Sequence, residues 1–231
     1  MKLLAIDSSG LVASVALLYD DILVGEYTIH NKKTHSQTLL PMIDELIRIA
    51  DTDKHELDAI AVAAGPGSFT GLRIGAATAK GLAQALGIPI VPVSTLEGLS
   101  YNLQGSKDFV CPIMDARRSQ VYACLYDVSD EEPRALIRED AYPIDELKEA
   151  VLKNKGDRVI FLGDGVPVYE DWLRDIPGVV FASDAVRYQR ASSVAALGRL
   201  YAEQGKAVPA KDFAPVYLRK SQAEREREEK R

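Results

Sequence analysis

The chain has 231 residues, of which 47% are hydrophobic, and its formal net charge is −6. That length suits one large domain or two small lobes, and the composition is that of a soluble globular protein. The acidic balance, without any long basic run, argues against unaided binding to a nucleic-acid backbone.

Three sequence features bear on the compartment. No stretch approaches the roughly 20 apolar residues that a membrane span requires, and Asp7 interrupts the first apolar run too early for a secretion signal. The two cysteines, Cys111 and Cys124, suit a reducing compartment and are expected to be free thiols. We therefore expect a cytoplasmic protein that does not contact a membrane.

The first 104 residues are expected to form one α/β lobe, opened by a meander of three strands. Its elements are expected to be strands at 2–8, 12–19 and 22–29, a helix at 34–50, a strand at 58–63, a helix at 67–86, a strand at 90–93 and a helix at 95–103. The polar run at 104–108 is the best boundary by composition, so a new lobe is expected to begin there.

Residues 105–190 are expected to repeat the pattern as a second, smaller α/β lobe. The expected elements are strands at 109–114, 120–128 and 134–139, a helix at 143–154, a strand at 159–162, a helix at 168–175 and a strand at 179–181. A C-terminal helix and return segment would occupy 191–218. The almost wholly charged run at 219–231 is expected to be a solvated tail.

The segment GPGSFTGLRIG at residues 65–75 links an apolar strand to an alanine-rich helix. It is not a phosphate-binding Walker loop, because no Gly-Lys-Ser/Thr follows. Small residues recur every four positions and so share one helix face; they are Gly67, Gly71, Gly75, Ala79 and Ala83. This smooth face has two interpretations, packing on the chain's own sheet or docking of a partner, and the pattern leaves both open.

The helix at 34–50 carries more apolar surface than one buried face requires. Two stripes are expected, one of Leu39, Met42, Leu46 and Ile49 and the other of Leu40, Ile43, Ile47 and Ala50. One stripe can face the chain's own sheet. The other needs a second layer, which is either the helix at 67–86 or another protein.

Two turns of the first lobe have the composition of a phosphate site, although a polar hairpin turn is the simpler explanation of the first. The residues are Asp7, Ser8, Ser9, Gly65, Gly67 and Ser68. Helix N-terminal amides near such turns often face an anion. The second lobe offers only the turn at 163–165, so the predicted site is vestigial. We expect no cofactor and at most weak nucleotide binding.

Signatures of metal-dependent or nucleophilic catalysis are not found in the sequence. His35 begins a helix, but Leu39 stands four residues later, where a second histidine would complete a metal-binding pair. Ser68 is followed by Phe69 and Thr70 rather than by the residues of a nucleophile elbow. We therefore expect neither a metal site nor a catalytic residue.

Four segments resemble those of the TsaB family, the bacterial accessory subunits for threonylcarbamoyladenosine formation in tRNA. They are LAIDSS at 4–9, HSQTL at 35–39, GPGSFTGLRIG at 65–75 and MDAR at 114–117, followed by a Val-Tyr pair at 121–122. The third is highly specific, and the resemblance spans nearly the whole chain. It implies a two-lobed actin-like ATPase (ribonuclease H-like) fold, with a duplicated mixed sheet and flanking helices.

The resemblance also implies a function and partners. TsaB-like chains pair with the catalytic relative TsaD through helices of the first lobe, and the ATPase TsaE joins them. A homodimer is expected when the chain is alone, and tRNA contact only through the complex. The docking residues are then expected to be His35, Leu39, Met42, Ile43, Leu46, Gly71, Gly75, Ala79 and Leu82.

The catalytic relative binds a metal through two histidines on the first long helix, and Leu39 replaces the second of them in this chain. The implied role is therefore a non-catalytic scaffold of the tRNA-modifying complex. The alternatives are an actin-fold ATPase or kinase with its own nucleotide site, and a metallopeptidase, which Leu39 disfavours.

Overall fold

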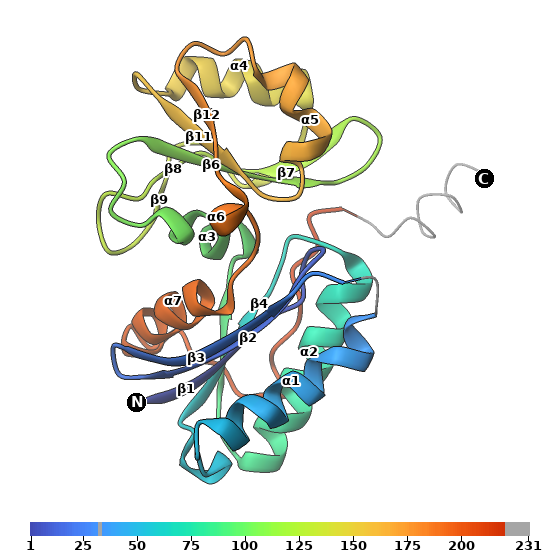
Figure 1. The fold of residues 1–231 in the computed structure, drawn as a ribbon, viewed down its shortest axis with the longest axis vertical. Helices are drawn as coiled ribbons and strands as arrows, with labels where there is room; N and C mark the ends of the chain where they lie inside the picture. Colours follow the sequence, from blue (N-terminus) through green and yellow to red (C-terminus); the bar gives the residue numbers. More distant parts are fainter. Residues whose placement is uncertain (32–33, 220–231) are drawn as a thin grey trace, which may run out of the picture.

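Two lobes, each built on one β-sheet, lie one above the other in the structure, a computed structural model that describes residues 1–31 and 34–219 (Figure 1). The first sheet has the order β3-β2-β1-β4-β5. Its strands are β1 (Lys2–Asp7), β2 (Ala13–Tyr19), β3 (Ile22–Ile29), β4 (Ala59–Ala63) and β5 (Ile90–Val93). Strands β1 to β3 form the expected antiparallel meander, whereas β1, β4 and β5 run parallel.

Helices cover the first sheet on both faces. Helices α1 (His35–Ile49) and α2 (Phe69–Leu86) pack on one face, and α7 (Ala191–Glu203) packs on the other. Side chains of β1 alternate between the two cores, with Leu4 facing α1 and α2 and Leu3 facing α7. Central strands buried on both faces read as continuous apolar runs, which is why the sequence identified them. The last helix of the chain thus belongs spatially to the first lobe.

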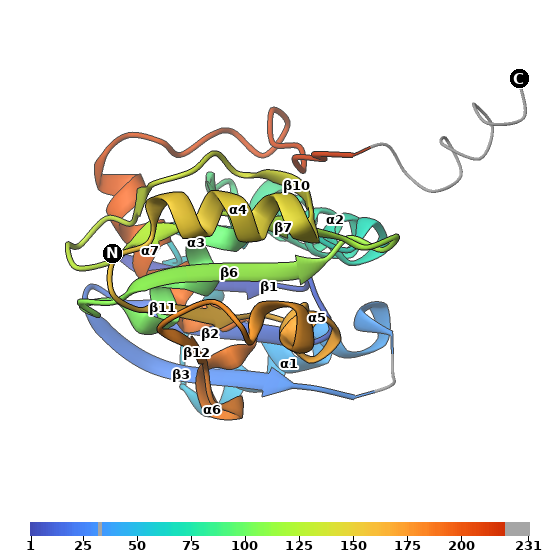
Figure 2. The same cartoon turned by 90° about the horizontal axis from the view of Figure 1, so that it is seen from above.

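The second sheet has the order β10-β7-β6-β11-β12, with the short strand β8 paired to β6 and the short strand β9 paired to β8. Its strands are β6 (Phe109–Asp115), β7 (Gln120–Ala123), β8 (Tyr126–Asp127), β9 (Arg134–Ala135), β10 (Asp140–Pro143), β11 (Val159–Leu162) and β12 (Val179–Phe181). Helices α4 (Ile144–Asn154) and α5 (Val166–Leu173) form one layer, nearest the viewer in Figure 2, and α3 (Thr95–Ser100) lies on the other side. The duplicated α/β architecture expected from the sequence is confirmed.

Local departures from the expected elements occur in the second lobe. The strand expected at 120–128 is divided, because β7 ends at Ala123 and the chain resumes pairing only at Tyr126. A short helix, α6 (Asp184–Arg187), was not expected. Cys111 joins the core under α4 and α5 whereas Cys124 joins the core beside α3, and both thiols are free as expected.

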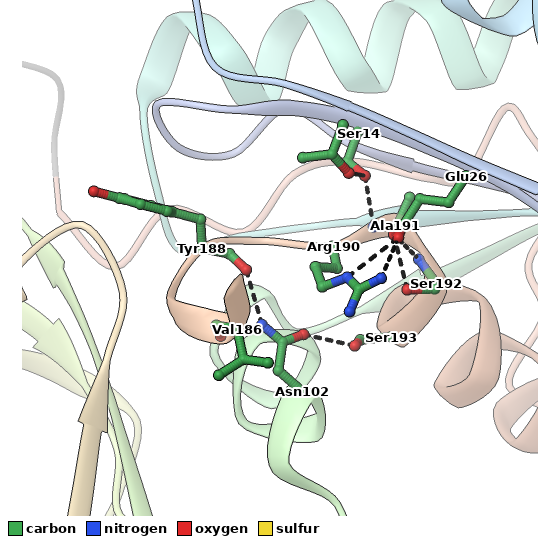
Figure 3. A network of polar contacts seen from close by, with 10 residues as sticks. Ser14, Glu26, Asn102, Val186, Tyr188, Arg190, Ala191, Ser192 and Ser193 are labelled. Carbon is green, nitrogen blue, oxygen red and sulfur yellow. Dashed lines mark hydrogen bonds and ion pairs between the residues drawn. The ribbon is translucent and has the colours of Figure 1, made fainter. Parts of the chain in front are cut away.

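The chain returns from the second lobe to the first through residues 182–191, and Asn102 fixes this crossing. Its Nδ2 atom donates to the carbonyl oxygens of Val186 at 2.9 Å and Tyr188 at 2.8 Å, and its Oδ1 accepts a 2.6 Å bond from Ser193 Oγ (Figure 3). Because Asn102 follows the outgoing helix α3, the two interlobe crossings are bonded to each other.

A second set of contacts in Figure 3 seats the start of α7 on the first sheet. Glu26 of β3 pairs with Arg190 at 2.6 Å and also accepts bonds from the backbone and side chain of Ser192. The amide of Ala191 donates to Ser14 Oγ of β2 at 2.8 Å. These bonds satisfy N-terminal amides of α7 and fix the returning chain to the first sheet, beside the two interlobe crossings.

Among residues 1–31 and 34–219, none of the helices combines the length and the apolar character that crossing a membrane requires. The charged tail expected at 219–231 lies outside the described residues, apart from Arg219.

Candidate functional site

The turn between β4 and α2 lies against the turn between β1 and β2. Ser68 caps α2, its Oγ accepting a 3.3 Å bond from the amide of Gly71. The Ser68 amide donates to the carbonyl oxygen of Ser9 at 2.7 Å. A Cβ on Gly71 would clash with the Ser8 carbonyl oxygen, and one on Gly75 would lie 2.5 Å from Ser8 Oγ. The glycines therefore let the helix backbone approach the β1–β2 turn.

This packing corrects the prediction that Gly71, Gly75 and Ala79 dock a partner. All three are buried within the first lobe, and Ala79 belongs to the core between the first sheet and the helices α1 and α2. The small-residue face that the sequence identified is real, but it serves the chain's own turn and sheet. Of the two interpretations left open by the pattern, internal packing is correct for these residues.

The docking residues predicted on α1 require the same correction. Leu39, Met42, Ile43 and Leu46 form a single buried stripe in that core, with Leu46 only 3% exposed. The two stripes expected from the sequence mixed inward and outward positions, since Ile49 is 59% exposed and Leu40 is 53% exposed. Buried side chains of a folded lobe are not available to a partner.

Two predicted docking residues keep part of their surface. Leu82 is half-buried at the edge of the core. His35 is half-buried, and its Nε2 atom forms a 2.9 Å hydrogen bond with the carbonyl oxygen of Gly10. His35 thereby ties the first turn of α1 to the β1–β2 turn, and a role for either residue in docking stays a prediction.

A second small-residue row on α2 faces outward. It consists of Ala77, Gly81 and Ala85, which are exposed and recur every four residues. A Cβ added at Gly81 would have no neighbour within 4 Å. The four-residue spacing of this row is also present in the sequence. Spacing alone, however, does not show which of the two small-residue rows on α2 faces solvent.

An apolar pocket of about 260 Å³ adjoins this row between α1 and α2. Its lining includes Ile47, Leu82 and Ala85. Leu40 lies seven residues before Ile47, which is two helical turns along the same side of α1. We call the set Leu40, Ile47, Ala77, Gly81, Leu82 and Ala85 the outer α1–α2 face. Small residues let the backbone of another helix approach α2 closely, and the neighbouring aliphatic side chains can pack against that helix.

The predicted phosphate-site residues are brought together at the base of the interlobe cleft, a cavity of about 600 Å³. Ser9, Gly67 and Ser68 line the cavity, together with Asp115 and Asp164 from the second lobe. The other three predicted residues, Asp7, Ser8 and Gly65, are buried beside them. Asp7 Oδ1 accepts bonds from both the amide and the Oγ of Ser9, at 2.9 and 2.6 Å. The amide and the hydroxyl group of Ser9 therefore already donate hydrogen bonds within the β1–β2 turn.

Two carboxyl groups in this region have shifted pKa values. Burial raises the pKa of Asp7 to about 6, partly opposed by the bonds from Ser9. Burial also raises the pKa of Asp164 to about 6, partly opposed by the 3.1 Å bond from the Asp115 amide. Carboxylates at this place would repel phosphate oxygens. In the part of the chain that the structure describes, no group of three or more His, Cys, Asp or Glu side chains is arranged to hold a metal ion.

The sequence model of the family described as "TsaD: tRNA N6-adenosine threonylcarbamoyltransferase" matches residues 23–227. The tRNA threonylcarbamoyladenosine biosynthesis protein TsaB of Bacillus subtilis is 36% identical over 226 residues, covering 97% of this chain and 96% of that protein. The TsaB protein of Escherichia coli is 29% identical over 231 residues, with 96% of each chain covered.

Solved structures of similar proteins have the same fold as this chain. YeaZ from Pseudomonas aeruginosa superposes with a TM-score of 0.82 at 29% identity, covering 94% of this chain and 99% of that one. The ethanolamine utilization protein EutJ shares only the fold, with a TM-score of 0.52 at 12% identity. The two-lobed actin-like fold expected from the resemblance is confirmed. Close relatives aligned over almost their full length, together with the family match, place this chain in the TsaB family, within the wider TsaD-type family.

Proposed function

We propose that the chain is a non-catalytic subunit of the machinery that forms threonylcarbamoyladenosine in tRNA, and that it acts by docking a TsaD-type catalytic subunit. A role in this process is supported by the B. subtilis and E. coli relatives, which are named as tRNA threonylcarbamoyladenosine biosynthesis proteins. The observation that carries the docking role is the outer α1–α2 face, where a smooth helix row borders an apolar pocket. Such a face exposes apolar area that a partner helix would cover.

The same face would pair two copies of the chain when the catalytic subunit is absent. In the full assembly a TsaE-like ATPase joins, and tRNA reaches this chain only through the complex. The net charge of −6 supports the last point, because direct phosphate binding needs clustered cations. We place the protein in the cytoplasm, where tRNA modification takes place.

The non-catalytic role rests on what surrounds His35. The position four residues on is Leu39, which is 1% exposed in the core, so no second ligand faces that histidine from the same side of α1. One similar P. aeruginosa structure is described as resembling the peptidase YeaZ. We infer that peptidase activity is absent from this chain, because within residues 1–31 and 34–219 no cluster of metal-ligating side chains includes His35, whose Nε2 atom is bonded to a backbone carbonyl.

The outer α1–α2 face is tested by Gly81→Leu. A Cβ added at Gly81 has no neighbour within 4 Å in the free chain, and the substitution replaces a poor helix former, so stability should rise by about 1 kcal/mol. At a close helix–helix interface the added bulk typically costs about 1–3 kcal/mol, which weakens association roughly five- to a hundred-fold. Calorimetric titration with the TsaD-type subunit and thermal unfolding measure the two effects.

Gly81→Ala should give a smaller loss of association, and Lys153→Leu, an exposed change on α4, should give none. If Gly81→Leu binds the catalytic subunit as tightly as the unchanged chain, the outer α1–α2 face is not the docking surface.

The alternative, an ATPase or kinase with its own nucleotide site, is tested by titrating the isolated chain with ATP and Mg²⁺. The engaged donors of Ser9 and Ser68 and the nearby carboxyl groups of Asp7 and Asp164 oppose phosphate binding. We expect a dissociation constant above about 1 mM, equivalent to less than about 4 kcal/mol of binding free energy. Micromolar affinity would favour the enzyme instead.

A further inference from the structure

The segment after α7 returns along the first lobe before it reaches the interlobe cleft, and Figure 2 shows it running along one side of the molecule. Val208 pairs with Ile90 of β5 through two backbone bonds. Phe213 is buried in the core between the first sheet and the helices α1 and α2, and its carbonyl oxygen accepts a 2.8 Å bond from Lys80 Nζ. Up to Phe213 the segment is therefore anchored firmly on the first lobe.

Beyond Phe213 the segment crosses from one lobe to the other. The amide of Val216 donates to the carbonyl oxygen of Ala64 at 2.7 Å, and the Tyr217 ring lies 4.7 Å from the Phe69 ring, between centroids. Arg219 Nη1 then donates to the carbonyl oxygen of Ala116 at 2.8 Å, in the second lobe. Val216, Tyr217 and Arg219 all line the cleft.

The turn between β4 and α2 on the first lobe lies in close contact with this segment. Gly65 has a φ of +121°, and a Cβ there would clash with the carbonyl oxygen of Val216. The glycine thus satisfies two needs at once, a backbone conformation that other residues rarely adopt and close approach of a second chain segment. The same turn carries the predicted phosphate-site residues Gly67 and Ser68.

We propose that residues 213–219 form a releasable strap that holds the two lobes together across the mouth of the interlobe cleft. Its anchor at Phe213 is buried, whereas its crossing part is exposed: Val216 by 53% and Tyr217 by 39%. A strap fixed at one end and held by exposed contacts at the other can detach without unfolding the lobe. The lobes stay joined by the crossings that Asn102 bonds together, so detachment widens the cleft about that hinge.

The strap is tested in the full chain by spin labels placed on either side of the cleft. Gln37→Cys on α1 and Asp171→Cys on α5 provide exposed positions, while the buried thiols of Cys111 and Cys124 are shielded from the label. Pulsed dipolar spectroscopy then gives the distribution of the distance between the lobes. Excess unlabelled chain suppresses signals between molecules.

Combining Tyr217→Ala with Arg219→Ala should raise the population of long distances about tenfold, as the loss of a ring contact and a charged hydrogen bond implies. Amide exchange at Val216 should accelerate by a similar factor. Arg158→Ala is the matched control, because that arginine pairs with Asp108 at the far end of the second sheet. A distance distribution and exchange rates equal to those of the control would overturn the strap, as would an unchanged chain that is already fully open.

Discussion

Leu46→Asp is expected to unfold the first lobe at room temperature. The leucine is 3% exposed, and its Cδ1 atom lies close above Gly25 of β3. Removing such a side chain typically costs about 2–5 kcal/mol, and an unpaired carboxylate in the same place adds the loss of its hydration. The sum is a large part of the 5–15 kcal/mol by which most domains are stable. Urea unfolding followed by circular dichroism measures it.

The matched control lies six residues earlier on the same helix. Leu40→Asp changes a side chain that is 53% exposed, so the unfolding free energy should change by less than about 0.5 kcal/mol. If the outer α1–α2 face docks the catalytic subunit, Leu40→Asp should nevertheless weaken association. A folded Leu46→Asp chain with lost association would instead return the docking surface to the residues first predicted from the sequence.

Asp7→Asn is expected to stabilise the protein at neutral pH. The folded-state pKa of Asp7 is raised by burial to about 6, above the ordinary value of 3.8, so the folded state binds its proton more tightly than the unfolded chain. This stabilisation is complete below about pH 4 and is lost as the pH rises through 6. The difference between a pKa of about 6 and one of 3.8 corresponds to about 3 kcal/mol of unfolding free energy. Asparagine stays neutral and keeps the acceptor for Ser9, so it should recover most of that amount at pH 7.

The measurement is the unfolding free energy of both proteins between pH 4 and pH 8. The difference between them should grow across the window from about 4 to 6 and then level off. Asp171→Asn, on an exposed carboxyl, should show no such growth. Equal stability of the Asp7→Asn and unchanged chains at pH 7 would mean that the Asp7 carboxylate is solvated in the folded protein.

The sequence was sufficient to predict most helices and strands of the first lobe, but it did not show which face of each helix points to the core. Strands such as β1 and β4 are buried on both sides and appear as apolar runs, and the glycine-rich turn marks the start of α2 without ambiguity. The direction of a helix face depends on a distant neighbour, here the Ser8 backbone against Gly71. The sequence pattern therefore does not distinguish the two small-residue rows of α2, the buried row with Gly71 and Gly75 and the exposed row with Gly81.

The candidate site was only partly accessible from sequence for the same reason. The residues predicted to form a phosphate site belong to two turns whose acidic, hydroxyl and glycine residues can be recognised from local composition alone. The role of Val216, Tyr217 and Arg219 depends on a return path across both lobes, which no local pattern encodes. Likewise, the raised pKa of Asp164 depends on its burial beneath the β6–β7 turn, not on its immediate sequence.

The position of α7 delays completion of the first lobe during synthesis on the ribosome. Leu3, Ala5 and Val91 face α7, which ends at Glu203, about 110 residues after the last strand of the first sheet. At translation rates of roughly 5–20 residues per second, that sheet face waits about 5–20 s for its cover. During this interval the whole second lobe emerges and can finish folding first. The first sheet is synthesised before the second lobe but is covered by α7 only afterwards. Until then it exposes an apolar surface of the kind that chaperones bind.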